Sequence, residues 1–216
     1  MATLRFHQRL YKMSDVLPFV LLAVAYLLGS VCSAILVCKA LGLPDPRTQG
    51  SNNPGATNVM RLGGKGPALM TLAGDMLKGV PLVLLARHWG LPGDLVSAIG
   101  LAAFLGHLYP VYFRFEGGKG VATALGVLLA LDWQLGLAVI GLWLIAFALS
   151  RISSLGALTA FTAAPLLAWY LDPGYMLGVV GMSVLLIARH KANIKALLKG
   201  EEKKFGASKK QTQEKE

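Results

Sequence analysis

Long apolar stretches separated by short polar connections run through most of the chain. A helix needs about 20 mostly apolar residues to cross the hydrocarbon core of a bilayer, and most of these stretches approach that length. They lie near residues 16–38, 66–87, 94–112, 121–131, 134–150, 155–170 and 174–188. The pattern predicts an all-α fold, a polytopic integral membrane bundle of seven transmembrane helices.

The fourth stretch, 121–131, is shorter than a full span and is bounded by Gly120 and Asp132. We therefore expect this pass to be broken or to cross incompletely. Seven passes place the N-terminus outside and the C-terminus in the cytoplasm. A six-pass arrangement stays open, because the basic residues of 1–14 would favour a cytoplasmic N-terminus.

Composition supports a membrane protein. Hydrophobic residues make up 55% of the 216 positions, charged residues only 15%, and the mean hydropathy is +0.57, whereas soluble domains carry about 25% charged residues. The net charge is +10, and nine of the 21 Lys and Arg residues lie between positions 189 and 215. A basic tail could bind nucleic acid, but beside an apolar bundle it more often marks the cytoplasmic face and contacts anionic lipid.

The connections differ sharply in charge. The turns at 91–94, 131–133 and 171–174 contain no Lys or Arg, whereas the opposite connections and the tail together carry sixteen of the 21. The positive-inside rule places the basic face in the cytoplasm. The glycine-rich and polar clusters lie on this face, so we expect them to converge in space.

Three regions are expected: an N-terminal extension at 1–14, disordered or interfacial; a membrane domain at 15–200; and a basic cytoplasmic tail at 201–216. Cys32 and Cys38 have no metal-site spacing and are expected to be packing residues.

The first polar cluster is GSNNPGATNVMR at 50–61, preceded by Arg47. Its short polar side chains are Ser51, Asn53, Thr57 and Asn58. Such residues, together with Gly, suit a tight loop that presents amides and hydroxyls to an anion. The alternative is an ordinary polar connection.

Two charges, Asp75 and Lys78, lie inside the second apolar stretch one helical turn apart. Charges at membrane depth are functional or paired, and these two can pair with each other. The sequence leaves a structural pair and a functional site equally open.

The most distinctive stretch is GHLYPVYFRFEGGKGVAT at 106–123. Gly117, Gly118 and Gly120 allow the backbone to approach a ligand, and Lys119 supplies a positive charge. A nucleotide-binding P-loop would need Ser or Thr after the lysine, which Gly120 replaces. His107 could donate to a phosphate or act as a general acid or base, or it could be a packing residue.

Two smaller polar groups complete the basic face. Ser153 follows Arg151 at a helix junction, where it could also be a cap. The last apolar stretch closes with Arg189, His190, Lys191 and Asn193; snorkelling accounts for the two long cations but less well for His190 and Asn193. The pooled Arg, Lys, His, Asn and Ser side chains favour a phosphate ligand, and no spacing suggests a metal site.

These motifs are specific enough to indicate a family. Gly29-Ser30, GSNNPGATNVMR, DMLKG at 75–79, the 106–123 stretch, RISSLGA at 151–157 and RHKANIKALLKGEE at 189–202 together resemble the bacterial acyl-phosphate-dependent glycerol-3-phosphate acyltransferases. The resemblance implies a seven-span inner-membrane enzyme with its active site facing the cytoplasm and no cofactor. It makes lysophosphatidic acid from glycerol 3-phosphate and acyl phosphate, the first acylation of phospholipid synthesis, and depends on another enzyme to supply the acyl phosphate.

Matching motif positions assigns roles. Catalysis is expected from Arg47, Lys119, Ser153, His190 and Asn193, which with Ser30 bind substrate phosphate and hold the glycerol hydroxyl. Thr57 and Asn58 are expected to shape the first loop beside Ser51 and Asn53, while His107, Gly117, Gly118 and Gly120 form a floor for the acyl phosphate. Asp75 and Lys78 belong to the same predicted site. The proton acceptor is left open between a histidine and the substrate's own phosphate.

Two positions depart from the family pattern. Asn52 stands where a glycine is usual, and Glu116 stands where a lysine is frequent. Asn is among the residues that best tolerate left-handed backbone conformations, so the loop is expected to persist.

Two other classes remain as alternatives. The first is an anion or phosphate-ester transporter, although no inverted repeat is evident and the polar motifs gather at one face. The second is a non-catalytic membrane subunit, which would not need so many polar anchors.

Overall fold

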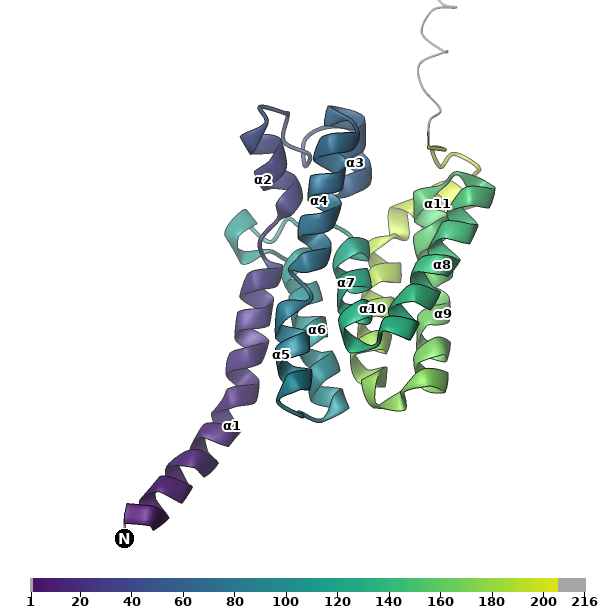
Figure 1. Ribbon diagram of the computed structural model, residues 1–216. Coiled ribbons are helices and arrows are strands. Elements are labelled where there is room, and N and C mark those ends of the chain that lie inside the picture. The colour runs from purple at the N-terminus through teal and green to yellow at the C-terminus, as the bar shows by residue number, and fades with distance from the viewer. Residues whose placement is uncertain (1, 206–216) are drawn as a thin grey trace, which may run out of the picture.

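The structure is a computed structural model that describes the backbone of residues 2–205 and the side chains of residues 16–205. This part of the chain forms a bundle of helices (Figure 1). The longer helices are α1 (Ala2–Gly29), α4 (Lys65–Leu77), α6 (Gly93–Leu108), α7 (Val121–Leu131), α8 (Trp133–Ser150), α9 (Ser153–Leu171) and α10 (Met176–Arg189). The shorter ones are α2 (Ser33–Ala40), α3 (Ala56–Gly63), α5 (Pro81–His88), α11 (Lys191–Leu198) and the 3-10 turns η1 (Val111–Phe113) and η2 (Pro173–Tyr175).

The apolar stretches of the sequence coincide with these helices, which confirms the all-α membrane fold. Within the described residues, five segments are long and apolar enough to cross a bilayer: Val16–Ala40, Lys65–His88, Gly93–Phe113, Trp133–Ser150 and Ser153–Leu171. A sixth is reached if α10 and α11, which are bent by 58° to each other, form one broken span. Seven passes require counting α7, and its 11 residues extend only about 16 Å. The seven-pass count and its sidedness therefore stay predictions.

The predicted N-terminal extension and basic tail are described only in part. The backbone of residues 2–14 continues α1 as helix, and a role for this stretch as an interfacial extension stays a prediction. Residues 206–216 of the predicted basic tail lie outside the described residues. In Figure 1 the start of α1 and the end of α11 lie at opposite ends of the bundle.

Two of the predicted spans are interrupted. The first breaks between α1 and α2 at residues 30–32, and the second breaks between α4 and α5 at residues 78–80. Figure 1 shows both breaks at a similar level to the segment that links α6 to α7, part-way along the bundle. Non-helical backbone at membrane depth is tolerated where protein surrounds it or where it lines a polar site, so this level is where a functional site is expected.

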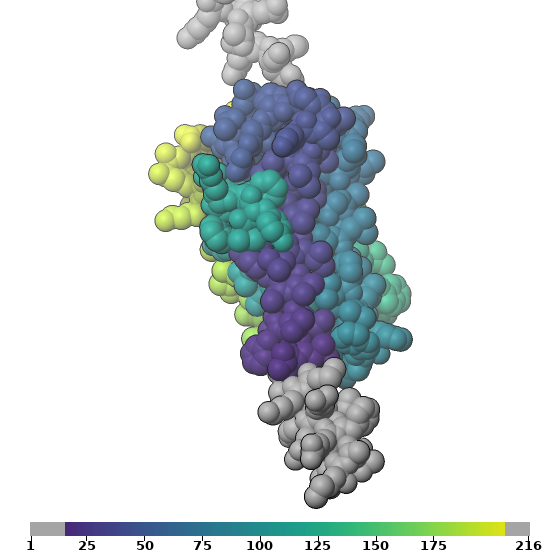
Figure 2. Space-filling view, turned by 90° about the vertical axis from the view of Figure 1, so that its left-hand side faces the viewer, coloured from purple at the N-terminus to yellow at the C-terminus, as the bar shows by residue number. Residues whose placement is uncertain are grey.

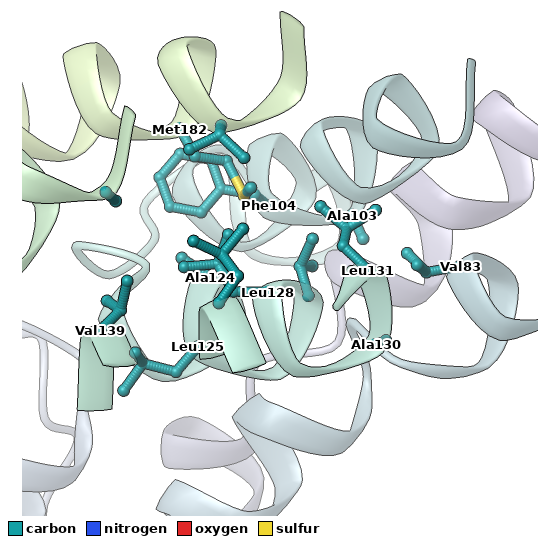
Figure 3. Packing of buried hydrophobic residues seen from close by; sticks show 14 of the residues in the cluster. Val83, Ala103, Phe104, Ala124, Leu125, Leu128, Ala130, Leu131, Val139 and Met182 are labelled. Atoms are coloured by element: carbon teal, nitrogen blue, oxygen red, sulfur yellow. The ribbon is translucent and has the colours of Figure 1, made fainter. Parts of the chain in front are cut away.

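Helix α7 lies at the centre of the core. Eight of its residues are buried, among them Ala124 and Leu128, and Figure 3 shows these packed near Phe104 of α6 and Met182 of α10. A helix that is apolar all round lies either in a protein core or in contact with lipid, and the burial of α7 places it in the core. In its last turn, Arg87 Nη1 donates to the Ala130 carbonyl oxygen at 2.8 Å.

Helix α1 packs closely against α6 next to the break between α1 and α2. A Cβ atom added at Gly29 would lie 2.0 Å from the Ala103 carbonyl oxygen, and one added at Gly106 would lie 2.2 Å from the Tyr26 carbonyl oxygen. Small residues allow membrane helices to approach this closely. The contact holds Ser30 and His107, which follow these glycines, at the same level.

We expect Gly106→Ala to lower the free energy of unfolding by about 1–3 kcal/mol, because overpacking displaces α1 from α6. Denaturant unfolding in detergent measures this change. Gly141→Ala in α8 is the matched control, since an added Cβ there has nothing within 4 Å. Equal destabilisation by both variants would contradict the close-packing argument.

Candidate functional site

Four segments that are far apart in the sequence meet at the predicted basic face. Arg47 of the α2–α3 connection pairs with Glu116 of the α6–α7 connection at 3.3 Å. Thr57 Oγ1 lies 3.3 Å from Ser153 Oγ at the start of α9. Lys119 Nζ donates to Asn193 Oδ1 of α11 at 2.5 Å. The predicted convergence of these motifs is therefore present in the structure.

Lys119 is part of a chain of polar contacts. Asn193, which accepts from Lys119, donates through Nδ2 to Glu202 Oε1 at 2.6 Å, and Ser154 Oγ donates to the same oxygen at 2.6 Å. Burial lowers the pKa of Lys119, Glu202 opposes this shift, and the nearby charges of Arg61 and Arg189 reinforce it. Sequence reasoning did not single out Glu202, although it lies within the last family motif.

The α6–α7 connection packs so closely against the end of α6 that only glycine fits at several of its positions. A Cβ added at Gly118 would lie 2.3 Å from His107 Nε2, and one at Gly117 would lie 2.0 Å from the His107 carbonyl oxygen. Gly120 has a φ of +86°, which strongly favours glycine, and it directly precedes α7. The loop thus delivers Lys119 to the start of α7, whose first-turn amides have no intrahelical acceptors.

Arg189 has a different role from the one its position suggests. The sequence predicts that Arg189 snorkels toward the membrane surface, and this prediction is wrong. The Nη2 atom donates to the carbonyl oxygens of Gly117 at 2.9 Å and Gly118 at 3.2 Å, and the guanidinium lies 5.6 Å from the centre of the Tyr109 ring. Arg189 therefore holds the glycine loop in place.

The first loop is organised around Asn58, which is buried. Its Nδ2 donates to the carbonyl oxygens of Pro46 and Gln49, both at 2.9 Å, and its Oδ1 accepts from the Ser51 amide at 2.9 Å. Asn58 shapes the loop, as predicted. Asn52 adopts a φ of +53°, which confirms that asparagine takes over the left-handed position. Ser51 is exposed and Asn53 half-buried.

Arg47 is held by two carboxylates. Its Nε and Nη2 contact the Asp45 carboxylate at 3.1–3.2 Å and 2.7 Å, and its Nη1 reaches Glu116 Oε2 at 3.3 Å. The Arg47 guanidinium lowers the pKa of the Asp45 carboxyl. Glu116 is the more exposed partner, with 66% of its side chain accessible, so it is the one that a phosphate ligand could replace.

Asp75, Lys78 and His107 form one buried cluster. Lys78 Nζ lies 3.0 Å from Asp75 Oδ1 and 2.9 Å from His107 Nδ1, and it donates to the Val31 carbonyl oxygen at 2.7 Å. The side chains of Asp75 and Lys78 are only 2% and 7% exposed. The pairing that the sequence left open is present, and the cluster also reaches His107 beneath Gly118.

Ser30 and His190 are both buried and bonded to their own helices. Ser30 Oγ donates to the Tyr26 carbonyl oxygen at 2.8 Å, and His190 Nδ1 lies 2.8 Å from the Leu186 carbonyl oxygen. Since a carbonyl oxygen only accepts, Nδ1 of His190 carries a proton. When that ring is neutral, its Nε2 is left as an acceptor.

Comparison with known proteins shows the family to which the chain is similar. The family model for glycerol-3-phosphate acyltransferase matches residues 19–200. The chain is 57% identical over 184 residues to a glycerol-3-phosphate acyltransferase of Thioalkalivibrio sulfidiphilus, covering 84% of this chain and 91% of the relative. It is 53% identical over 191 residues to one of Methylococcus capsulatus, covering 88% and 96%.

Solved structures agree as well. Crystal structures of PlsY (YgiH), an integral membrane glycerol 3-phosphate acyltransferase, superpose on this fold in a glycerol 3-phosphate form and a lysophosphatidic acid form. Their TM-scores are 0.83 and 0.81, with 39% and 38% identity, and they cover 88% of this chain and 96% and 95% of theirs. The chain belongs to the glycerol-3-phosphate acyltransferase family.

Proposed function

We propose that the protein transfers an acyl group from acyl phosphate to the free primary hydroxyl of glycerol 3-phosphate. The products are 1-acylglycerol 3-phosphate (lysophosphatidic acid) and inorganic phosphate. The observation that carries the proposal is the contact between Lys119 and Asn193. It joins the glycine loop and the last helix at one cationic site, beside the contact of Thr57 with Ser153.

The chemistry suits this donor set. Acyl phosphate is a mixed anhydride. The substrate hydroxyl forms a C–O bond to its carbonyl carbon while the C–O bond to phosphate breaks, and the hydroxyl proton passes to a histidine or to the substrate's own phosphate. Because phosphate is a good leaving group, the reaction depends mainly on positioning and on stabilising negative charge. Lys119 and Arg47 provide that charge stabilisation, and Ser153, Asn193 and His190 hold the hydroxyl and the phosphate of the acceptor.

The glycine loop suits the donor phosphate. Gly117, Gly118 and Gly120 let the backbone of the loop pack directly against the end of α6, and the free amides at the start of α7 face an anion favourably. Arg189 fixes the carbonyl oxygens of this loop, so they are held by a cation and do not repel a phosphate. The acyl chain would extend into the apolar surroundings of the bundle.

The charge pattern of the connections supports a cytoplasmic site in the inner membrane of a bacterium. Glycerol 3-phosphate would reach it from the cytoplasm. Acyl phosphate must come from an enzyme that activates fatty acyl groups with phosphate, so the protein would work downstream of such an enzyme, as the first acylation step of phospholipid synthesis.

Purified protein in detergent should release phosphate only when acyl phosphate and glycerol 3-phosphate are both present. Lys119→Ala and Arg47→Ala should each lower kcat/KM roughly 100-fold or more, because each removes a charge that stabilises phosphate or oxyanion. Acyl-CoA in place of acyl phosphate should give no product. Uptake of glycerol 3-phosphate into vesicles without turnover would support the transporter class instead, and unchanged kinetics in both variants would refute the residue assignment.

Gly118→Ala should lower kcat/KM at least about tenfold, because the added methyl group displaces the loop or the His107 ring and misplaces reacting groups. Gly66→Ala is the matched control. It lies in the second GGKG sequence, at 63–66, where an added Cβ has nothing within 4 Å. Loss of activity in both variants to the same extent would show that the space around Gly118 is not the reason.

Glu116→Gln should lower the KM for glycerol 3-phosphate by up to about fivefold, because an exposed carboxylate that competes for Arg47 is worth about 0–1 kcal/mol. Glu201→Gln removes the same charge from an exposed position and controls for a general change in surface potential. An unchanged KM in Glu116→Gln, or an equal decrease in Glu201→Gln, would contradict direct competition at Arg47.

A further inference from the structure

The buried Asp75–Lys78–His107 cluster contains an ion pair and a histidine directly below the glycine loop. Lys78 has three N–H donors and no acceptor. Three acceptor atoms lie within 3.0 Å of its Nζ atom: the Val31 carbonyl oxygen, Asp75 Oδ1 and His107 Nδ1. Every donor of Lys78 therefore has a partner within the protein.

This arrangement determines where the proton of His107 lies. An ammonium group can only donate, so His107 Nδ1 must accept, and the proton of the neutral ring is on Nε2. Asp75 Oδ1 is 3.6 Å from His107 Nδ1, too far for a hydrogen bond. A protonated ring would also bring a second positive charge to within 2.9 Å of Lys78 in a site that excludes water.

The Nε2 atom faces the glycine loop. A Cβ added at Gly118 would lie 2.3 Å from it and 3.0 Å from the Pro54 carbonyl oxygen of the first loop. No described residue forms a hydrogen bond with Nε2, and this atom is not completely shielded from solvent. A single N–H donor is thus presented between the two loops that the proposed function assigns to the substrates.

We propose that Lys78 acts as a positioning residue which holds His107 in the Nε2–H form, so that His107 is a permanent hydrogen-bond donor to a phosphoryl oxygen of the acyl phosphate and not a general base. The substrate role rests on the proposed function, whereas the position of the proton does not. His190 shows the opposite arrangement, because its Nδ1 donates to the Leu186 carbonyl oxygen. Of these two buried histidines, only His190 then has a lone pair available at Nε2.

Lys78 is accordingly excluded as a direct phosphate ligand. Its charge is balanced by Asp75, and its contact with the Val31 carbonyl oxygen ties the break in the first span to the break in the second. Its effect on turnover would pass through His107 and the position of the α1–α2 break.

Nitrogen-15 NMR of histidine-labelled protein in detergent tests the position of the proton without any substrate. The His107 signals, assigned by their loss in His107→Gln, should show an unprotonated Nδ1 and a protonated Nε2 throughout the pH range of activity. In the charge-neutral double variant Asp75→Asn with Lys78→Met, protonation should shift at least partly to Nδ1. A protonated Nδ1 in the wild-type protein, or no change in the double variant, would overturn the proposal.

Kinetics test the donor role. His107→Gln keeps an N–H donor, and we expect kcat/KM to fall by no more than about tenfold. His107→Phe keeps a ring of similar size but has no donor, and removing one such donor should lower kcat/KM about 10²–10³-fold. If His107 were a general base, both variants would fall alike, by 10²–10⁴-fold, and equal losses would overturn the donor role.

The NMR and kinetic experiments distinguish failure of the proposed function from failure of the proposal for Lys78 and His107. If the wild-type protein releases no phosphate, the proposed function fails while the NMR result still decides the proton position. If His107→Phe does not fold, the activity retained by His107→Gln and the NMR signals of the wild-type protein still decide the proposal.

Discussion

Backbone that leaves helical geometry inside a bilayer must find its hydrogen-bond partners within the protein, and this requirement governs how the site is built. The breaks in the first two spans and the α6–α7 connection expose carbonyl groups at a similar level of the bundle. Long polar side chains reach them: Lys78 donates to the Val31 oxygen, Arg189 to the oxygens of Gly117 and Gly118, and Tyr26 to the Tyr109 oxygen at 2.7 Å. The side chains that stabilise the irregular backbone thereby also hold the loops of the site in register.

The same requirement divides the cations into two groups. Lys78 and Arg189 donate to backbone oxygens, and Lys78 is also paired with the buried Asp75, so we assign both a positioning role. Lys119 and Arg47 contact side-chain groups, Asn193 and the Asp45 and Glu116 carboxylates, which an incoming phosphate could rearrange at smaller cost. A count of positive charges alone would treat these four residues as equivalent.

Much of this site could be predicted from the order of its motifs. The sequence singled out the glycine loop, the first polar loop and the His190–Asn193 pair, and the contacts of Lys119 and Thr57 show that these motifs meet. It missed Glu202, because an acid in a strongly basic tail has no pattern that marks it as a partner of Asn193 and Ser154. It misjudged Arg189, because a cation at a helix end looks the same in sequence whether it reaches toward lipid headgroups or toward a loop.

The helical membrane bundle with a cationic, glycine-rich face follows from the sequence alone, because the hydrophobic length of each segment and the charge of each connection are local properties. The sequence also indicated the family, since six motifs in order are a one-dimensional pattern. The breaks in the spans, the cations that already have partners and the nitrogen of His107 that faces Lys78 are evident only in the folded molecule. Those depend on contacts between residues that are distant along the chain, such as Lys78 with Val31 and His107, and no local pattern specifies them.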